Sequence, residues 1–170
     1  MRGLTKVTVV AGLLGLAACA EKPAAEAPPA EQPMAMAPAP EDMMMMAVSA
    51  KSLQWGPIQP EGWAPGLTVA AVHGDPAVPD QPYVIRLRLP DGYKFPPHYH
   101  PKTENLTVLS GTFMLENGDV ASDNLKTYVP GDFLYLPGMQ PHYGAVKGNT
   151  EVQLHGVGPF EIKNGKPPAA

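Results

Sequence analysis

From about residue 48 onward, short apolar segments alternate with turn-forming residues. No long stretch shows the 3.6-residue apolar period of a helix, whereas the short runs rich in β-branched and aromatic residues are typical of strands. Glycine, proline and aspartate separate the runs, as at Asp91-Gly92 and Pro130-Gly131. Many short, closely spaced strands predict an all-β barrel or sandwich. The expected strands are 67–72, 83–89, 98–100, 105–109, 112–116, 126–129, 133–136, 142–145 and 152–157.

The start of the chain follows a different pattern. Two basic residues, Arg2 and Lys6, precede an apolar run at 7–18. As a helix this run would extend about 20 Å, which is too short for a hydrocarbon core of about 30 Å. A basic start, a short apolar centre and small residues at the end indicate a secretory signal peptide over residues 1–18.

The end of this segment, Leu16-Ala17-Ala18-Cys19, resembles a bacterial lipobox. The resemblance implies that Cys19 carries a lipid, becomes the first mature residue and anchors the chain in the cell envelope, facing the periplasm or the exterior. Cys19 is the single cysteine of the chain, so it has no partner for an internal disulfide. An ordinary signal peptide with a buried thiol and an uncleaved anchor helix are the alternatives.

Residues 19–47 are rich in alanine, proline, glutamate and methionine and contain no aromatic residue. Such a composition cannot bury enough apolar surface to offset the entropy of ordering, so it predicts a disordered tether. The methionines at 34, 36 and 43–46 are soft donors that suit Cu(I). Low-complexity sequence in a linker is the simpler explanation of them.

Charge narrows the expected partners of the folded part, residues 48–170. Without residues 1–18 the chain keeps 10 basic and 16 acidic residues, a formal charge of −6, and most of the excess lies in the tether. The remaining domain is near −2 and has no basic stripe. Nothing in this balance favours nucleic-acid binding.

The histidines are the candidate chemistry of the domain. His98 and His100 have the spacing of residues that point to one side of a strand. Glu104 lies at the start of the next predicted strand, immediately before residue 105, and His142 lies on a later hairpin. Imidazole and carboxylate together suit Fe, Mn, Ni, Zn or Cu(II), so the set predicts a divalent metal site if the strands converge.

Two motifs resemble those of the cupin superfamily. The first reads Gly92, five residues, His98-Tyr99-His100, three residues, Glu104, six residues and Gly111, and it matches at every position and spacing. The second matches at Gly131, Pro137 and His142, whereas Met139 stands where the family has glycine and Val146 where it has asparagine. The resemblance implies a jelly-roll barrel, or double-stranded β-helix, with His98, His100, Glu104 and His142 as metal ligands lining the interior. Family members are often dimers, which makes a homodimer a possible state.

Five further residues are weaker candidates. If Val152 and Leu154 pack outward, His155 faces the barrel interior and could act on a substrate from beside the metal; a hydrogen-bonded wall residue is the alternative. Arg86 and Arg88 share a strand face that could meet an anionic substrate, although paired arginines are commoner on solvated faces. Trp55 and Trp63 precede the first predicted strand; their expected role is to cap an open edge or the bottom of the barrel.

Two functional hypotheses remain open at this level. A three-histidine, one-glutamate site with an open coordination position could serve a metal-dependent oxygenase, isomerase or lyase acting on a small molecule. A closed, fully coordinated site would instead favour a non-enzymatic module that senses or captures a metal or small ligand. An exchangeable water on the metal distinguishes the two.

Overall fold

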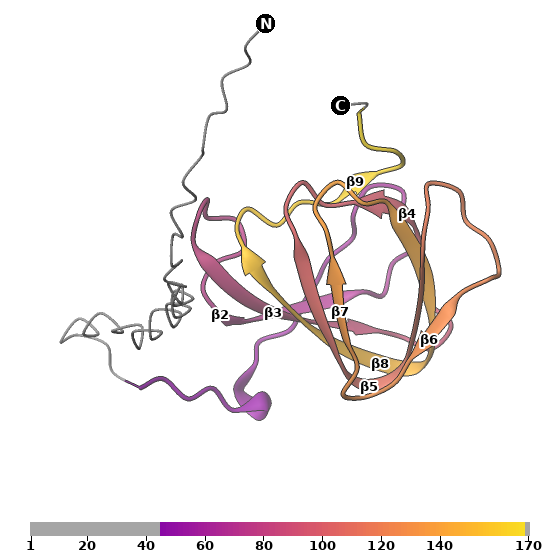
Figure 1. Cartoon of the computed structure of the whole chain (residues 1–170). Coiled ribbons are helices and arrows are strands. Elements are labelled where there is room, and N and C mark those ends of the chain that lie inside the picture. The colour runs from indigo at the N-terminus through magenta and orange to yellow at the C-terminus, as the bar shows by residue number, and fades with distance from the viewer. Residues whose placement is uncertain (1–44, 169–170) are drawn as a thin grey trace, which may run out of the picture. The chain divides into compact units, whose positions relative to one another are not determined.

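The computed structural model describes residues 45–168, which form strands and one 3-10 turn with no other helix among them (Figure 1). The elements are η1 (Ala50–Ser52), β1 (Gly56–Pro57), β2 (Thr68–His73), β3 (Pro82–Leu89), β4 (Lys94–Tyr99), β5 (Glu104–Asn117), β6 (Lys126–Tyr128), β7 (Phe133–Leu136), β8 (His142–Val157) and β9 (Lys163–Asn164).

Every strand pair is antiparallel. One path through the sheet runs β1-β2-β3-β8-β4-β9, and β5 pairs with β6, β7 and β8. Because β8 pairs with β3, β4 and β5, the sheet curls around a common interior, as Figure 1 shows. The predicted all-β jelly-roll barrel is confirmed.

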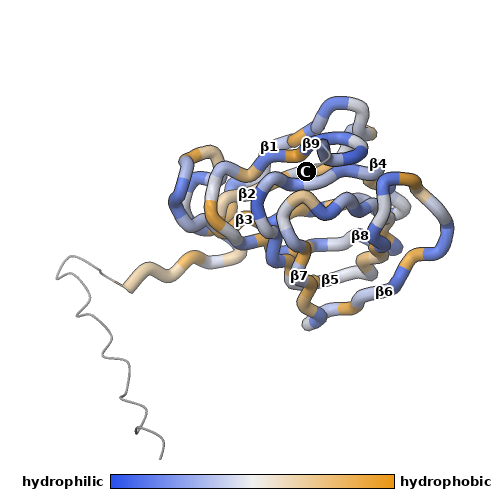
Figure 2. Tube along the Cα trace, turned by 45° about the horizontal axis from the view of Figure 1, so that its top comes forward, coloured by the Kyte–Doolittle hydropathy of each residue, from blue (hydrophilic) through white to orange (hydrophobic). Residues whose placement is uncertain are grey.

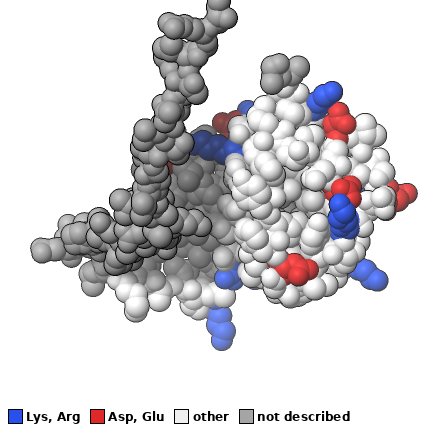
Figure 3. Space-filling model, in the orientation of Figure 1, with Lys and Arg blue, Asp and Glu red and all other residues white. Residues whose placement is uncertain are grey.

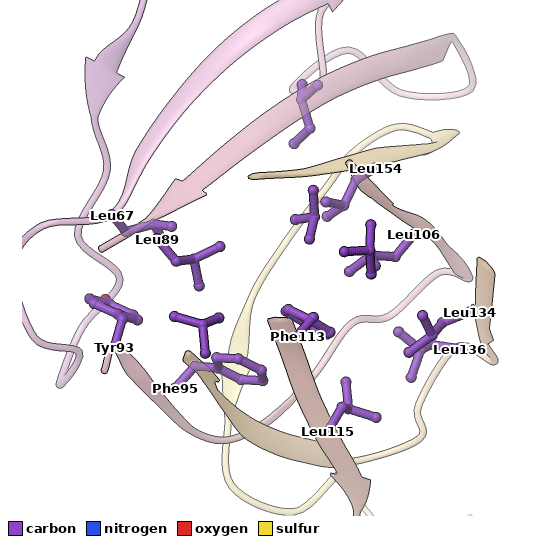
Figure 4. Close-up of a cluster of buried hydrophobic side chains, with 14 of the residues drawn as sticks. Leu67, Leu89, Tyr93, Phe95, Leu106, Phe113, Leu115, Leu134, Leu136 and Leu154 are labelled. Atoms are coloured by element: carbon purple, nitrogen blue, oxygen red, sulfur yellow. The ribbon is translucent and has the colours of Figure 1, made fainter. Parts of the chain in front are cut away.

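Alternation of inward and outward side chains builds the core. On β3, Tyr83, Ile85 and Leu89 are buried, whereas Arg86 and Arg88 lie on the outer face. Figure 2 shows the resulting mixture of hydrophobic and hydrophilic positions along the strands. The buried side chains of several strands meet inside the barrel, as the leucine, phenylalanine and tyrosine side chains of Figure 4 illustrate. This core surrounds the functional site described below.

Two of the predicted breaks between strands are wrong. The segments expected at 105–109 and 112–116 are one strand, β5, and those expected at 142–145 and 152–157 are one strand, β8. Ser110-Gly111 is an irregularity in the ladder rather than a turn that ends the strand. Gly111 has φ +75°, and a Cβ there would lie 2.3 Å from the Thr150 hydroxyl, so the bend requires glycine.

The predicted signal peptide at 1–18, Cys19 and most of the predicted tether at 19–47 lie outside the described residues. Of the tether, residues 45–47 are described, and they are exposed and have no regular structure. Within residues 45–168 no helix is long and apolar enough to cross a membrane.

Charged side chains of both signs are scattered over the face shown in Figure 3.

Candidate metal centre

Strand pairing brings the predicted ligands together. In the β4–β8 ladder, His98 and His142 are direct partners, so their side chains start side by side on the inner face. His100 follows the end of β4, and Glu104 is the first residue of β5. All four side chains are buried, with between 3% and 5% of each residue exposed. The interior therefore contains three imidazoles and one carboxylate at a single place.

The backbone fixes how each imidazole is oriented. Nδ1 of His98 lies 2.8 Å from the carbonyl of Pro96, and Nδ1 of His142 lies 3.1 Å from that of Gln140. Nδ1 of His100 lies 2.7 Å from the carbonyl of Glu161. A carbonyl oxygen can only accept, so each Nδ1 must carry a proton and donate it. In the neutral ring, Nε2 is then left with a free lone pair, which is the form that binds a metal.

These lone pairs face one another and a carboxylate. One ring nitrogen from each of the three histidines lies within 4.8 Å of the others. Oε2 of Glu104 lies 3.2 Å from Nε2 of His100 and 3.6 Å from Nε2 of His142. In the neutral ring protonated on Nδ1, the buried Nε2 of His100 has no hydrogen-bond partner. A cation between these donors would satisfy them together, and bonds of about 2.0–2.2 Å to one ion place neighbouring donors about 3.0–3.5 Å apart. The donor set therefore fits a divalent metal ion.

The same contacts shift the ionisation of the group. Burial, reinforced by the neighbouring His142 and His100, lowers the pKa of His98 to about 3. Burial also lowers the pKa of His142, against the opposing effect of Glu104. Burial opposes the ionisation of Glu104. The attraction between its carboxylate and the imidazolium form of His100 outweighs burial and lowers the Glu104 pKa to about 2. The pKa of His100 is raised, because the attraction of Glu104 exceeds the effect of burial. The metal-free site thus favours neutral His98 and His142 and an ionised Glu104.

We expect acid to destabilise the metal-free protein through this site. In the unfolded state the His98 side chain takes up a proton below about pH 6.5, whereas in the folded state it stays neutral down to about pH 3. Between these two pH values the unfolded state binds more protons, so acid favours unfolding. The lowered pKa of Glu104 acts in the same direction as pH falls from 4.5 to about 2. The raised pKa of His100 acts in the opposite direction, because it stabilises the fold at low pH and this stability is lost as pH rises through that pKa. Urea titrations after chelation should show a loss on the order of 2 kcal/mol between about pH 7 and about pH 4. His98→Ala should flatten this pH dependence, whereas alanine in place of His73, an exposed residue at the end of β2, should not. Equal pH dependence in the unaltered chain and both variants would contradict this expectation.

Aromatic side chains enclose the centre on two sides. The Trp63 ring packs edge-on against His98, with 4.7 Å between ring centroids. The Phe160 ring stacks on His100 at 4.8 Å. Trp63 precedes β2 and Phe160 lies between β8 and β9, so both come from segments outside the long barrel strands. They shield the polar cluster from water on these sides.

A small apolar cavity adjoins the cluster. Its volume is about 40 Å³, and His98, Glu104 and His142 are the polar residues in its lining. The other lining residues are aromatic or aliphatic and nearly all buried, and several of them appear in Figure 4. They are Trp63, Leu67, Leu87, Leu89, Phe95, Leu106, Phe113, Leu115, Leu136 and Val152. The candidate metal centre therefore opens onto an apolar interior.

Comparison with known proteins agrees with this architecture. The family model described as the cupin domain matches residues 85–158, which include every member of the polar cluster. Residues 85–158 form a cupin domain. No curated protein sequence matches the chain significantly.

Several solved structures have the same fold as this cupin. The polyketide cyclase RemF from Streptomyces resistomycificus is 20% identical over 71% of this chain and 85% of its own, with a TM-score of 0.59. An acetylacetone dioxygenase from Acinetobacter johnsonii is 15% identical over 71% of this chain and 77% of its own, with a TM-score of 0.52. A cupin 2 conserved barrel domain protein from Rhodopseudomonas palustris is 12% identical over 66% and 77%, with a TM-score of 0.53. At these identities the likeness concerns the fold.

The departure of the second cupin motif at Met139 has a visible structural consequence. Met139 has φ +65°, in the left-handed region where glycine is unstrained and a side chain is not. Its backbone N–H donates to the carbonyl of His100 at 2.8 Å, which ties this turn to the ligand-bearing segment. The turn thus forms with methionine in the left-handed conformation, and it contacts the segment that bears His100.

The structure corrects the prediction for His155. Val152 and Leu154 are 1% exposed in the core, so they point inward and His155 points outward, where its ring stacks with that of Phe133. His155 therefore lies away from the metal centre. The two arginines of this cupin are also directed outward: Arg86 and Arg88 both bind the carboxylate of Glu151.

Three contributors to the site were not identified from the sequence. Trp63 was expected to cap the barrel, and it instead lines the cavity beside His98. Phe160 stacks on His100, and the backbone carbonyl of Glu161 orients that ring. For Trp63, the signal in the sequence was a tryptophan within a segment rich in proline and glycine. The carbonyl of Glu161 could not be identified from the sequence, because every residue has a backbone carbonyl.

Proposed function

We propose that this cupin binds one divalent metal ion through three imidazoles and one carboxylate. The arrangement of the imidazoles supports the proposal: a backbone carbonyl accepts from Nδ1 of each ring, so Nε2 is the nitrogen left to bind a metal. Nε2 of His100 is buried 3.2 Å from the Glu104 carboxylate. A bound cation would give this nitrogen a partner and would offset the repulsion between the neighbouring acceptor atoms. The donors are His98, His100, Glu104 and His142.

The donor chemistry suits Fe, Mn, Ni, Zn or Cu, and three histidines with one carboxylate do not select among them. When bound, the ion would supply a Lewis acid and a template for a ligand beside it. The protein's own residues fix the donors and limit water. The carbonyls of Pro96, Gln140 and Glu161 set the tautomers, and the rings of Trp63 and Phe160 cover two sides.

The function that we favour is a metal-dependent enzyme acting on a small molecule, of oxygenase, isomerase or lyase type. The apolar cavity next to His98, Glu104 and His142 supports it, since a ligand there could reach the ion. Two proteins of similar fold are named as a polyketide cyclase and an acetylacetone dioxygenase, both of which act on organic molecules. A non-enzymatic module that captures or senses a metal is the second candidate, and the burial of all four donors favours it.

Water exchange at the metal separates the two candidates. The full chain would be loaded with Mn(II), and the relaxation of solvent protons measured over a range of temperature and field. An enzyme requires an open position, so we expect at least one exchanging water on the protein-bound ion. Relaxation no greater than that of outer-sphere water would contradict the enzyme proposal and support a closed site.

We propose that the domain is displayed at the cell envelope by a lipid on Cys19. The basic start, the short apolar run and the sequence Leu16-Ala17-Ala18-Cys19 support this. The Cys19→Ser chain should accumulate as an unprocessed precursor or a soluble species, whereas the unaltered chain should fractionate with membranes. Fractionation, detergent partitioning and intact mass would measure this. Recovery of Cys19→Ser as a processed, lipid-bearing membrane protein would contradict the proposal.

A further inference from the structure

We infer that the molecule bound beside the metal has one coordinating end and a short, uncharged, apolar body, and that Trp63 limits the length of this body. The inference rests on the proposed metal centre and specifies the class of ligand that the centre accepts. It follows from the volume, the lining and the charge of the cavity.

The volume of the cavity sets the first limit. At about 40 Å³ it can hold more than a single water, which needs roughly 10–15 Å³ by this measure. It is far smaller than the cavity of roughly 150 Å³ that accepts benzene in an engineered protein. A chain of a few carbon atoms fits this space, whereas an aromatic ring does not.

The lining sets the polarity of the ligand. His98, Glu104 and His142 lie at one side of the cavity, and no lysine or arginine lines it. Arg86 and Arg88, the basic residues of β3, point outward and are paired with Glu151. A polar or charged group on the body of a ligand would therefore lose its hydration without finding a partner.

The charge of the site allows one anionic donor. A divalent ion together with Glu104 and three neutral imidazoles carries a net charge of about +1. One anionic ligand atom neutralises this charge. A second anionic group would have to lie in the apolar part of the cavity, which offers it no cation.

Trp63 forms one wall of the cavity, and it is held in place. Its indole N–H donates to Oδ1 of Asn164 at 3.0 Å, and the Asn164 amide donates to the carbonyl of Glu61 at 2.7 Å. Asn164 also pairs with His98 across β9 and β4. Asn164 is therefore a positioning residue: it fixes the ring beside His98 and so fixes the extent of the cavity.

The test uses the full chain loaded with Co(II), whose visible spectrum reports coordination of added carboxylates. Butanoate and succinate have equal carbon numbers and differ in the second charge. We expect butanoate to bind roughly 100-fold more tightly than succinate, because the second carboxylate of succinate would be buried unpaired. Hexanoate should bind more weakly than butanoate to the unaltered protein. Trp63→Ala should raise hexanoate affinity relative to butanoate by roughly tenfold, the value of two further buried methylenes.

Two further variants control for a disturbed fold. Asn164→Ala leaves Trp63 present but releases its ring, and should shift the preference for hexanoate in the same direction. Trp55→Ala removes a ring that packs on Arg88 outside the barrel and should leave the preference unchanged. If Co(II) does not bind, the proposed metal centre fails and this inference fails with it. If Co(II) binds but succinate equals butanoate, or if neither Trp63→Ala nor Asn164→Ala changes the chain-length preference, the inference alone is overturned.

Discussion

Replacing His100 by alanine is expected to lower the affinity of the protein for its metal by at least roughly 1000-fold. The change removes one of four donors and also frees the carbonyl of Glu161, which holds that ring in place. Loss of a group that merely orients a ligand costs about 10–100-fold, so loss of a ligand itself should cost more. Competition with a colorimetric chelator, together with elemental analysis, would measure the change. Glu104→Gln should give a comparable loss, because it keeps the shape but removes the charge.

Two histidines outside the centre provide matched controls. His155 lies on the outer face of β8, and His73 is exposed at the end of β2. Alanine at either position should leave one full equivalent of metal bound with unchanged affinity. Retention of metal by His100→Ala together with loss in either control would contradict the assignment of the ligands.

The second large effect is expected at Gly144, on β8 two residues after His142. A Cβ at this position would lie 2.1 Å from the carbonyl oxygen of Met114 and 2.4 Å from the Phe95 ring. The carbonyl belongs to β5, which pairs with β8 throughout this region. It therefore cannot move away without breaking the hydrogen bonds between the two strands. Gly144→Ala should therefore lower the free energy of unfolding by about 3 kcal/mol or more.

Urea denaturation with and without metal would measure this loss. Gly56→Ala is the matched control, because no atom lies within 4 Å of a Cβ built there. Its stability should stay within about 0.5 kcal/mol of that of the unaltered chain. A Gly144→Ala protein as stable as Gly56→Ala would show that the close approach of β5 and β8 does not constrain this position.

The strand pattern and the ligand spacing could be read from the sequence because both are local. His98 and His100 are two residues apart, and the two-residue period of a strand places them on one face. The pair Ser110-Gly111 predicts a turn, but it lies at an irregularity inside a strand, because a glycine with positive φ serves a bulge as well as a hairpin. β5 therefore appeared as two strands.

The predicted orientation of His155 is wrong because the sequence predicts 142–145 and 152–157 as two separate strands, whereas β8 is continuous. His142 faces inward, and counting by twos along β8 places Val152 and Leu154 inward as well, as the structure has them. A shift of one residue in that count turns every side chain to the opposite face.

The environment of the metal centre was beyond prediction for a different reason. The hydrogen bond from Trp63 to Asn164 joins residues 101 positions apart. The contact between His100 and Glu161 joins a side chain to a backbone carbonyl 61 positions away, which any residue could supply. Neither contact has a spacing or a residue type that marks it.

X-ray absorption at the zinc edge of the zinc-loaded full chain tests the metal centre most directly. We expect one ion per chain, with multiple-scattering features from three imidazoles at about 2.0–2.1 Å and an oxygen donor at about 2.0–2.2 Å. The three-imidazole signature should fall to two in His98→Ala. A spectrum of the unaltered protein without imidazole scattering, or a protein that retains no metal, would contradict the assignment of His98, His100, Glu104 and His142 as its ligands.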